Sequence, residues 1–194
     1  MRRKRASFRA NRTTDAAKHM KYSPLLIILH WVTLLLILFM VFTGLAFRFE
    51  WGDAGAIRGH QTIGQLLIVV LALRILAKLR QRTPYQNPHP FWERIAARTT
   101  HGALYLCMIA FVVTGYIAAS GLDRPVLVWP AGKAFARSDT GEMILEWHYA
   151  LKWVLLALVT LHVLGALKHL FWDKDDTFSH MTLRSRKDET QCTK

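Results

Sequence analysis

The sequence predicts an all-α integral membrane protein, a bundle of four helices with both termini in the cytoplasm. Hydrophobic residues make up 52% of the 194 residues, although the formal net charge is +13. The two kinds of residue are segregated, because apolar side chains fall in four long runs and most Lys and Arg lie outside them. A helix needs roughly 20 residues to cross a hydrocarbon layer of about 30 Å. Each apolar run is long enough to do so.

The four runs define the expected membrane helices. The first run follows Ser23 and Pro24, a capping residue and then a proline at a position where the missing N–H costs nothing. The last run ends at Phe171 and Trp172, and aromatic residues are typical of a membrane interface. We expect helices at about 25–47, 61–80, 101–121 and 147–171.

Basic residues predict the orientation. The first 24 residues hold eight Lys or Arg against the single acidic residue Asp15. The connection between the second and third runs and the C-terminal tail are also basic, whereas the connections near 48–60 and 122–146 mix both signs. Loops rich in Lys and Arg stay in the cytoplasm. The basic balance therefore indicates an anionic membrane surface as partner rather than a nucleic acid.

This pattern divides the chain into three parts. Residues 1–20 are expected to form a basic cytoplasmic extension, residues 21–183 the four-helix domain, and residues 184–194 a polar cytoplasmic tail. The two cysteines, Cys107 in an apolar run and Cys192 in the tail, form no disulfide framework.

Histidines inside the runs carry the expected chemistry. A charged residue at mid-span costs on the order of 2.5–3.5 kcal/mol, so ionisable residues there are functional candidates. His148 and His162 are 14 residues apart, which is four turns of a left-handed bundle and puts both side chains on one face. At about 1.5 Å per residue they are separated by roughly 21 Å. One ligand at each depth suits two stacked porphyrins.

The second ligand of each iron must come from another helix at matching depth. His60 opens the second run at the outer side, level with His148, and His30 lies near the inner end of the first run, level with His162. Depth therefore predicts an inner haem iron held by His30 and His162 and an outer haem iron held by His60 and His148. Ligation by two histidines leaves iron no open position, which favours electron transfer over oxygen binding.

Other interpretations of the histidines remain open. A lone histidine in a helix often makes an interhelical hydrogen bond, although four at matched depths are harder to explain in this way. A zinc site would need four ligands within about 2.1 Å of one ion, and a separation of roughly 21 Å forbids that. For His101, near the inner end of the third run, we expect a hydrogen-bonding or quinone-side role rather than ligation.

An interval of 14 residues recurs on the other helices, as His60 to Arg74, His30 to Gly44 and His101 to Gly115. Arg74 is expected to pair with a propionate of the inner haem, or alternatively to extend to the inner headgroups. Gly44 and Gly115 would leave room for a flat macrocycle at the outer level, or alternatively allow close helix packing.

Four stretches together resemble the bacterial cytochrome b561 family over about residues 21–183. They are KYSPLLIILHW, GHQTIGQLL, THGALYLCMIAFVVTGY and WHYALKWVLLALVTLHVLGALKHLFWDKDDTFSHM, of which the last is the most specific. The resemblance implies a multi-pass dihaem cytochrome of the bacterial inner membrane, with b-type haems on His30, His60, His148 and His162. It also implies electron exchange with ubiquinone, and one member of the family acts as a superoxide oxidase.

The expected activity is therefore that of a superoxide:ubiquinone oxidoreductase. Outer cations could steer the superoxide anion, although outer carboxylates partly offset them; these cations are Arg58, Arg124, Lys133 and Arg137. The alternative is a cytochrome b anchor subunit that relays electrons between quinone and a partner redox enzyme such as a hydrogenase or formate dehydrogenase. A haem-free transporter or structural bundle would be colourless.

Overall fold

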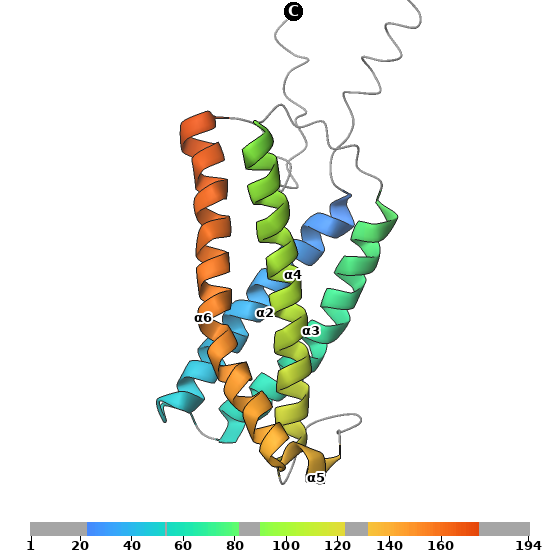
Figure 1. Cartoon of the computed structure of the whole chain (residues 1–194), viewed down its shortest axis with the longest axis vertical. Coiled ribbons are helices and arrows are strands. Elements are labelled where there is room, and N and C mark those ends of the chain that lie inside the picture. The colour runs from blue at the N-terminus through green and yellow to red at the C-terminus, as the bar shows by residue number, and fades with distance from the viewer. Residues whose placement is uncertain (1–22, 53, 82–89, 123–131, 175–194) are drawn as a thin grey trace, which may run out of the picture.

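The prediction of four membrane helices is confirmed. The computed structural model describes residues 23–52, 54–81, 90–122 and 132–174, in which every regular element is helical. The elements are α2 (Pro24–Arg48), α3 (Ala54–Arg80), α4 (Phe91–Ser120), α5 (Lys133–Ala136) and α6 (Asp139–Leu167), which continues into the π-helical turn η1 (Lys168–Asp173) (Figure 1). Four of these segments are long and apolar enough to cross a membrane. The expected extension 1–20 and tail 184–194 lie outside the described residues.

Three helices begin earlier than hydropathy indicated. α3 starts at Ala54, α4 at Phe91 and α6 at Asp139, each several residues before its apolar run. Hydropathy marks the hydrocarbon boundary, whereas a helix continues through polar turns wherever capping and charge favour it. Asp139 lies in the first turn of α6, where a negative charge interacts favourably with the helix dipole. As a result His60, His101 and His148 all lie well inside their helices.

Local interactions hold the helix ends in place. The Ser23 hydroxyl caps α2 by accepting from the Leu26 N–H at 3.3 Å, and the Ser138 hydroxyl caps α6 by accepting from the Gly141 N–H at 3.4 Å. A Cβ at Gly141 would overlap the backbone carbonyl of Ala136, so only glycine allows α5 to pack on the first turn of α6. The junction between α5 and α6 is therefore set locally.

The bundle consists of two hairpins. α2 packs along α3 and α4 packs along α6, whereas contacts between the hairpins are sparse and come mainly from α3 with α4. Figure 1 shows α4 and α6 along the long axis, with α2 and α3 inclined to them. We call the end of the bundle where α2 begins and α6 finishes the Pro24 end, and the opposite end, which carries α5, the α5 end. The candidate site lies between the hairpins.

The outer surface of the helices is apolar. Large side chains such as Leu35, Phe42 and Leu106 are 65%, 67% and 70% exposed, whereas Thr33 and Ser120 are 1% exposed. Large apolar side chains thus cover much of the outer surface, and small polar ones are among the most buried, which is unlike a soluble bundle. An apolar surface of this extent suits acyl chains of a bilayer.

Candidate cofactor sites

His60 and His148 face each other across the two hairpins near the α5 end. His60 lies on α3 and His148 on α6, and their half-buried rings have centres 6.3 Å apart with an interplanar angle of 85°. An imidazole nitrogen binds a metal at about 2.0–2.1 Å, and it lies about 1.1 Å from the ring centre, so two rings on opposite sides of one ion have centres roughly 6.3 Å apart. The separation therefore fits a single iron between the two rings.

Two threonines orient these rings. The hydroxyls of Thr43 and Thr114 donate to the backbone carbonyl four residues earlier, at 2.9 and 2.7 Å. Each hydroxyl oxygen can then only accept from the histidine, and it lies 3.2 Å from Nδ1 of His60 and 3.1 Å from Nδ1 of His148. The proton is therefore on Nδ1, and Nε2 keeps its lone pair. Ligating histidines usually have their second nitrogen held in this way.

The residue after each threonine is a glycine that lies against the same ring. A Cβ at Gly115 would be 2.8 Å from Cε1 of His148, and a Cβ at Gly44 would be 3.4 Å from Cε1 of His60. In this structure the two glycines thus make room for the imidazoles. Sequence reasoning missed the threonines, although the repeated Thr-Gly pair within two apolar runs was a readable signal.

His30 and His162 form a second pair nearer the Pro24 end. Their ring centres are 6.2 Å apart, with an interplanar angle of 62°, so this separation also fits one iron. Nη2 of Arg74 lies 2.7 Å from Nδ1 of His30. Because a guanidinium only donates, Nδ1 of His30 accepts, and the proton of the neutral ring lies on Nε2. The pair therefore has the spacing for a metal, but Nε2 of His30 becomes a ligand only when Arg74 turns to another acceptor.

A third histidine lies at the same level. The ring centre of His101 is 5.1 Å from that of His162, and its Nδ1 donates to the Ala97 carbonyl at 2.6 Å. The guanidinium of Arg74 also lies 5.3 Å from the centre of the Tyr105 ring. His101 is thus hydrogen-bonded, as expected, and its exclusion from the ligand set stays a prediction.

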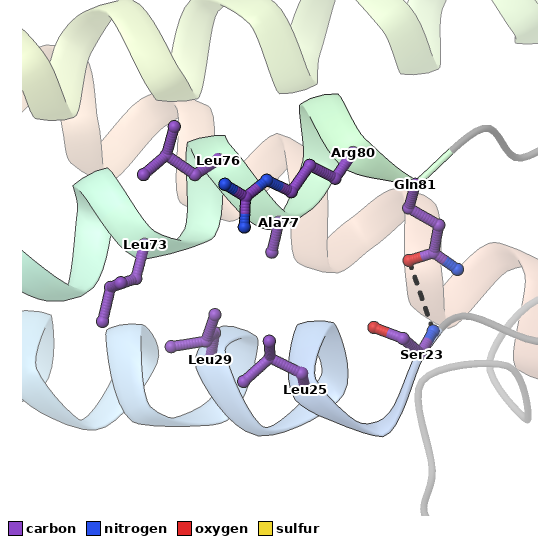
Figure 2. Close-up of a pocket in the computed structure, with 8 residues that line it drawn as sticks. All are labelled: Ser23, Leu25, Leu29, Leu73, Leu76, Ala77, Arg80 and Gln81. Atoms are coloured by element: carbon purple, nitrogen blue, oxygen red, sulfur yellow. Dashed lines mark hydrogen bonds between the residues drawn. The ribbon is translucent and has the colours of Figure 1, made fainter.

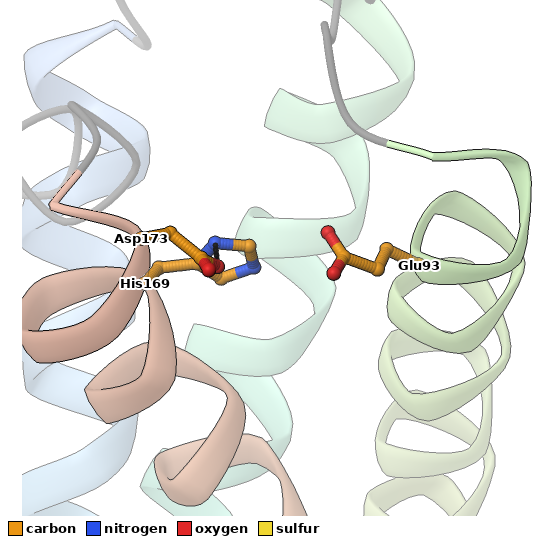
Figure 3. A group of neighbouring side chains, drawn as sticks. All are labelled: Glu93, His169 and Asp173. Carbon is orange, nitrogen blue, oxygen red and sulfur yellow. Dashed lines mark ion pairs between the residues drawn. The ribbon is translucent and has the colours of Figure 1, made fainter.

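The four paired histidines do not converge on a single ion. Among the described residues, the one group of three or more whose ligand atoms all lie within 4.8 Å of one another is Glu93, His169 and Asp173, at the Pro24 end (Figure 3). Nζ of Lys168 lies 2.9 Å from Glu93 and 2.7 Å from Asp173, so this cluster already contains a cation. The cluster connects the start of α4 to the end of α6. The two histidine pairs instead fit two separate irons, as in two haems.

Comparisons with known proteins agree with these features. The model of a family described as prokaryotic cytochrome b561 matches residues 21–183. Cytochrome b561 homolog 2 of Escherichia coli (strain K12) is 35% identical over 139 residues, which cover 66% of this chain and 71% of the relative. The relative named Probable superoxide oxidase CybB, from Yersinia pestis, is 30% identical over 177 residues, which cover 87% of this chain and 99% of the relative.

The resemblance noted in the sequence is confirmed by these matches. They imply binding of b-type haem and a role in electron transfer. A prokaryotic origin together with four membrane-spanning helices makes this a multi-pass protein of the bacterial inner membrane. Because the family model covers most of the chain and includes all four paired histidines, the chain belongs to the prokaryotic cytochrome b561 family.

Proposed function

We propose that the protein is a dihaem cytochrome that transfers electrons across the membrane to or from ubiquinone. One haem iron is bound by His60 and His148, the other by His30 and His162. The observation that carries the proposal is that both pairs bridge the two hairpins with ring centres 6.3 and 6.2 Å apart. Two pairs at two depths form a route from one side of the bilayer to the other.

The chain's own residues orient the ligands. Thr43 and Thr114 hold the proton of their histidines on Nδ1, which leaves Nε2 for iron. Arg74, once released from His30, is the cation available for a propionate at that level. Each haem supplies one-electron redox chemistry when bound. With two histidines on each iron, neither haem would keep an open position for dioxygen, which would favour electron transfer.

The Pro24 end faces the cytoplasm in this proposal. Described cations gather there, and they outnumber the carboxylates Glu93 and Asp173 at the same end; they are Lys78, Arg80, Arg94, Arg98, Lys168 and Lys174. By the positive-inside rule both termini are then cytoplasmic. Fusion of alkaline phosphatase to the C-terminus should give an inactive reporter, and an active one would reverse the orientation.

We further propose that the activity is superoxide oxidation coupled to ubiquinone reduction. Two superoxide ions each lose one electron and leave as dioxygen, and ubiquinone takes the two electrons with two protons to become ubiquinol. The relative named Probable superoxide oxidase CybB supports this choice of donor. Exposed Arg58, Lys133 and Arg137 lie at the α5 end, where superoxide would arrive. Arg124 lies outside the described residues.

Carboxylates limit the electrostatic attraction at that end. Glu50, Asp139 and Glu142 lie on the same surface as the cations, so the long-range field on superoxide is partly cancelled. We therefore expect the reaction rate to fall only modestly as ionic strength rises.

The test uses the haem-loaded protein in nanodiscs with ubiquinone. Superoxide from pulse radiolysis or from xanthine oxidase should reduce the haem and yield ubiquinol in a ratio of one per two superoxide ions. A rate no faster than that of the His148→Ala variant would end the proposal of superoxide oxidation. Stoichiometric co-purification with a metal-containing subunit would instead support the role of an anchor subunit.

A further inference from the structure

A groove opens between α2 and α3 at the Pro24 end. It has a volume of about 360 Å³ and is lined by the leucines Leu25, Leu29 and Leu73, with Ala77 on α3 (Figure 2). Leu73 and Gln81 mark its extent along α3, and eight residues of helix are about 12 Å long. The Ser23 N–H donates to the Gln81 side-chain carbonyl at 3.3 Å and closes the outer end. The groove is thus apolar along its length and polar at its end.

Arg80 brings a positive charge to the polar end. Its side chain lines the groove, and Figure 2 shows it running back along α3 beside Ala77. Within the described part of the chain, its guanidinium has no ion-pair or hydrogen-bond partner. Lys78 lies on another face of the same helix, and its Nζ is instead 4.5 Å from the centre of the Tyr105 ring. The groove therefore combines an apolar channel with a cation, at the end of membrane helix α3, that no described residue compensates.

We propose that this groove binds one anionic phospholipid, with the phosphate on Arg80 and an acyl chain along the leucines. An arginine presents donors that match phosphate oxygens, and the charge attracts an anion. Basic pockets between membrane helices commonly hold such headgroups. A neutral quinone would bury its tail equally well but would leave the charge of Arg80 uncompensated, so the charge favours the phospholipid.

The bound lipid would support the histidine site nearest this end. Leu29 directly precedes His30 on α2, and Leu73 directly precedes Arg74 on α3. Leu29 is 7% exposed and belongs to the core, whereas Leu73 is 50% exposed, so an apolar partner from the bilayer could still cover it. An acyl chain in the groove would cover Leu73 and restrain the two segments that carry His30 and Arg74.

Native mass spectrometry of the haem-loaded protein, titrated with phosphatidylglycerol or phosphatidylcholine, tests the proposal. We expect one site that prefers phosphatidylglycerol by at least about fivefold, the contribution of one basic side chain near a charged headgroup. Arg80→Gln should abolish the preference. Lys78→Gln removes the same charge from the same helix on another face and should retain it.

A second pair of variants tests the apolar part of the groove without changing charge. Ala77→Leu should fill the groove and weaken binding of both lipids, whereas Ala72→Leu, at an exposed position of the same helix outside the groove, should not. The proposal would be overturned if Arg80→Gln kept the preference for phosphatidylglycerol, or if Lys78→Gln lost it equally. Displacement of the lipid by ubiquinone at equal concentration would also overturn it.

Discussion

Thr43 and Thr114 occupy equivalent places on two different helices. Each donates its hydroxyl proton to its own helix and lies beside Nδ1 of a histidine on the neighbouring helix of its hairpin. Each is followed by a glycine against which the same imidazole packs. Two residues in sequence thus set the tautomer of the ring and make space for it, which is the preparation a metal-ligating histidine needs.

His148 should be required for one haem only. In His148→Ala the iron shared with His60 loses a ligand, whereas His30 and His162 are untouched, so the haem count should fall from two per chain to one. A pyridine haemochrome assay with circular dichroism checks the count and the helix content. His169→Ala is the control and should keep both haems. Full haem retention in His148→Ala would contradict the assignment.

Gly115 should tolerate a methyl group less well than Gly44. The added Cβ would lie 2.8 Å from the His148 ring at Gly115 and 3.4 Å from the His60 ring at Gly44, and only the first distance forces the ring to move. Gly115→Ala should therefore change the electron paramagnetic resonance signal of one haem, and Gly44→Ala should change it little. Gly102→Ala, where nothing lies within 4 Å, is the control.

Loss of the Thr114 hydroxyl should shift the potential of one haem. In Thr114→Val, Nδ1–H of His148 loses its hydroxyl acceptor, so the imidazole becomes a weaker donor and the ferrous state is favoured. The midpoint potential of that haem should rise, and its affinity should fall by roughly tenfold or more. Redox titration measures the shift. Thr33→Val is the matched control. The Thr33 hydroxyl bonds only to the Leu29 carbonyl in the described structure, so this variant should leave both midpoint potentials unchanged.

At the scale of the elements, the end of α6 is tied to the start of α4. The Lys168 ammonium group bridges the carboxylates of Glu93 and Asp173. Within the π-helical turn η1, Nδ1 of His169 lies 3.0 Å from Oδ2 of Asp173. Exposed ion pairs contribute little to global stability, so their effect should be local.

Lys168→Met should loosen this connection without unfolding the bundle. The carboxylates of Glu93 and Asp173 would lose their shared cation and repel each other, so amide hydrogen exchange should speed up in Lys168–Asp173. Exchange in the middle of α6 should stay slow, and mass spectrometry resolves the two regions. Equal acceleration along the whole helix would show that the cluster supports more than its own turn.

At the scale of the molecule, the two hairpins share one pattern. Along α2 the order is His30 and then Thr43-Gly44, and along α4 it is His101 and then Thr114-Gly115, with the same spacing. Each proposed ligand pair takes one histidine from each hairpin, and direct packing between the hairpins is sparse. The cofactors would thus supply much of the contact that joins the hairpins.

A chain divided within 82–89 should test this arrangement. Residues 1–85 carry His30 and His60, and residues 86–194 carry His148 and His162, so neither half has both ligands of either iron. Co-expressed halves should assemble and give the spectrum of two low-spin b haems, whereas each half alone should not. A low-spin haem in one half alone would contradict pairing across the hairpins. Expression of both halves in the membrane is the control.

Much of the fold could be predicted because membrane helices are encoded locally. The apolar runs identified all four spans, but they misplaced the starts of α3, α4 and α6, since hydropathy does not register polar turns that stay helical. The pairing of His30 with His162 and of His60 with His148 was predicted from depth, and the structure brings these rings together. The contact between Arg74 and His30 was not foreseen, because it depends on how α2 and α3 pack.

The sequence by itself determined the number of spans, the family and the depth of each histidine, because length, apolarity and spacing along a helix are one-dimensional properties. Only the tertiary structure decided which atoms meet. In it, the Thr114 hydroxyl contacts Nδ1 of His148 and the Arg74 guanidinium contacts Nδ1 of His30. The Arg80 side chain lines a groove between α2 and α3. These contacts depend on the rotation and distance of neighbouring helices, which packing sets and which spacing along one helix does not contain.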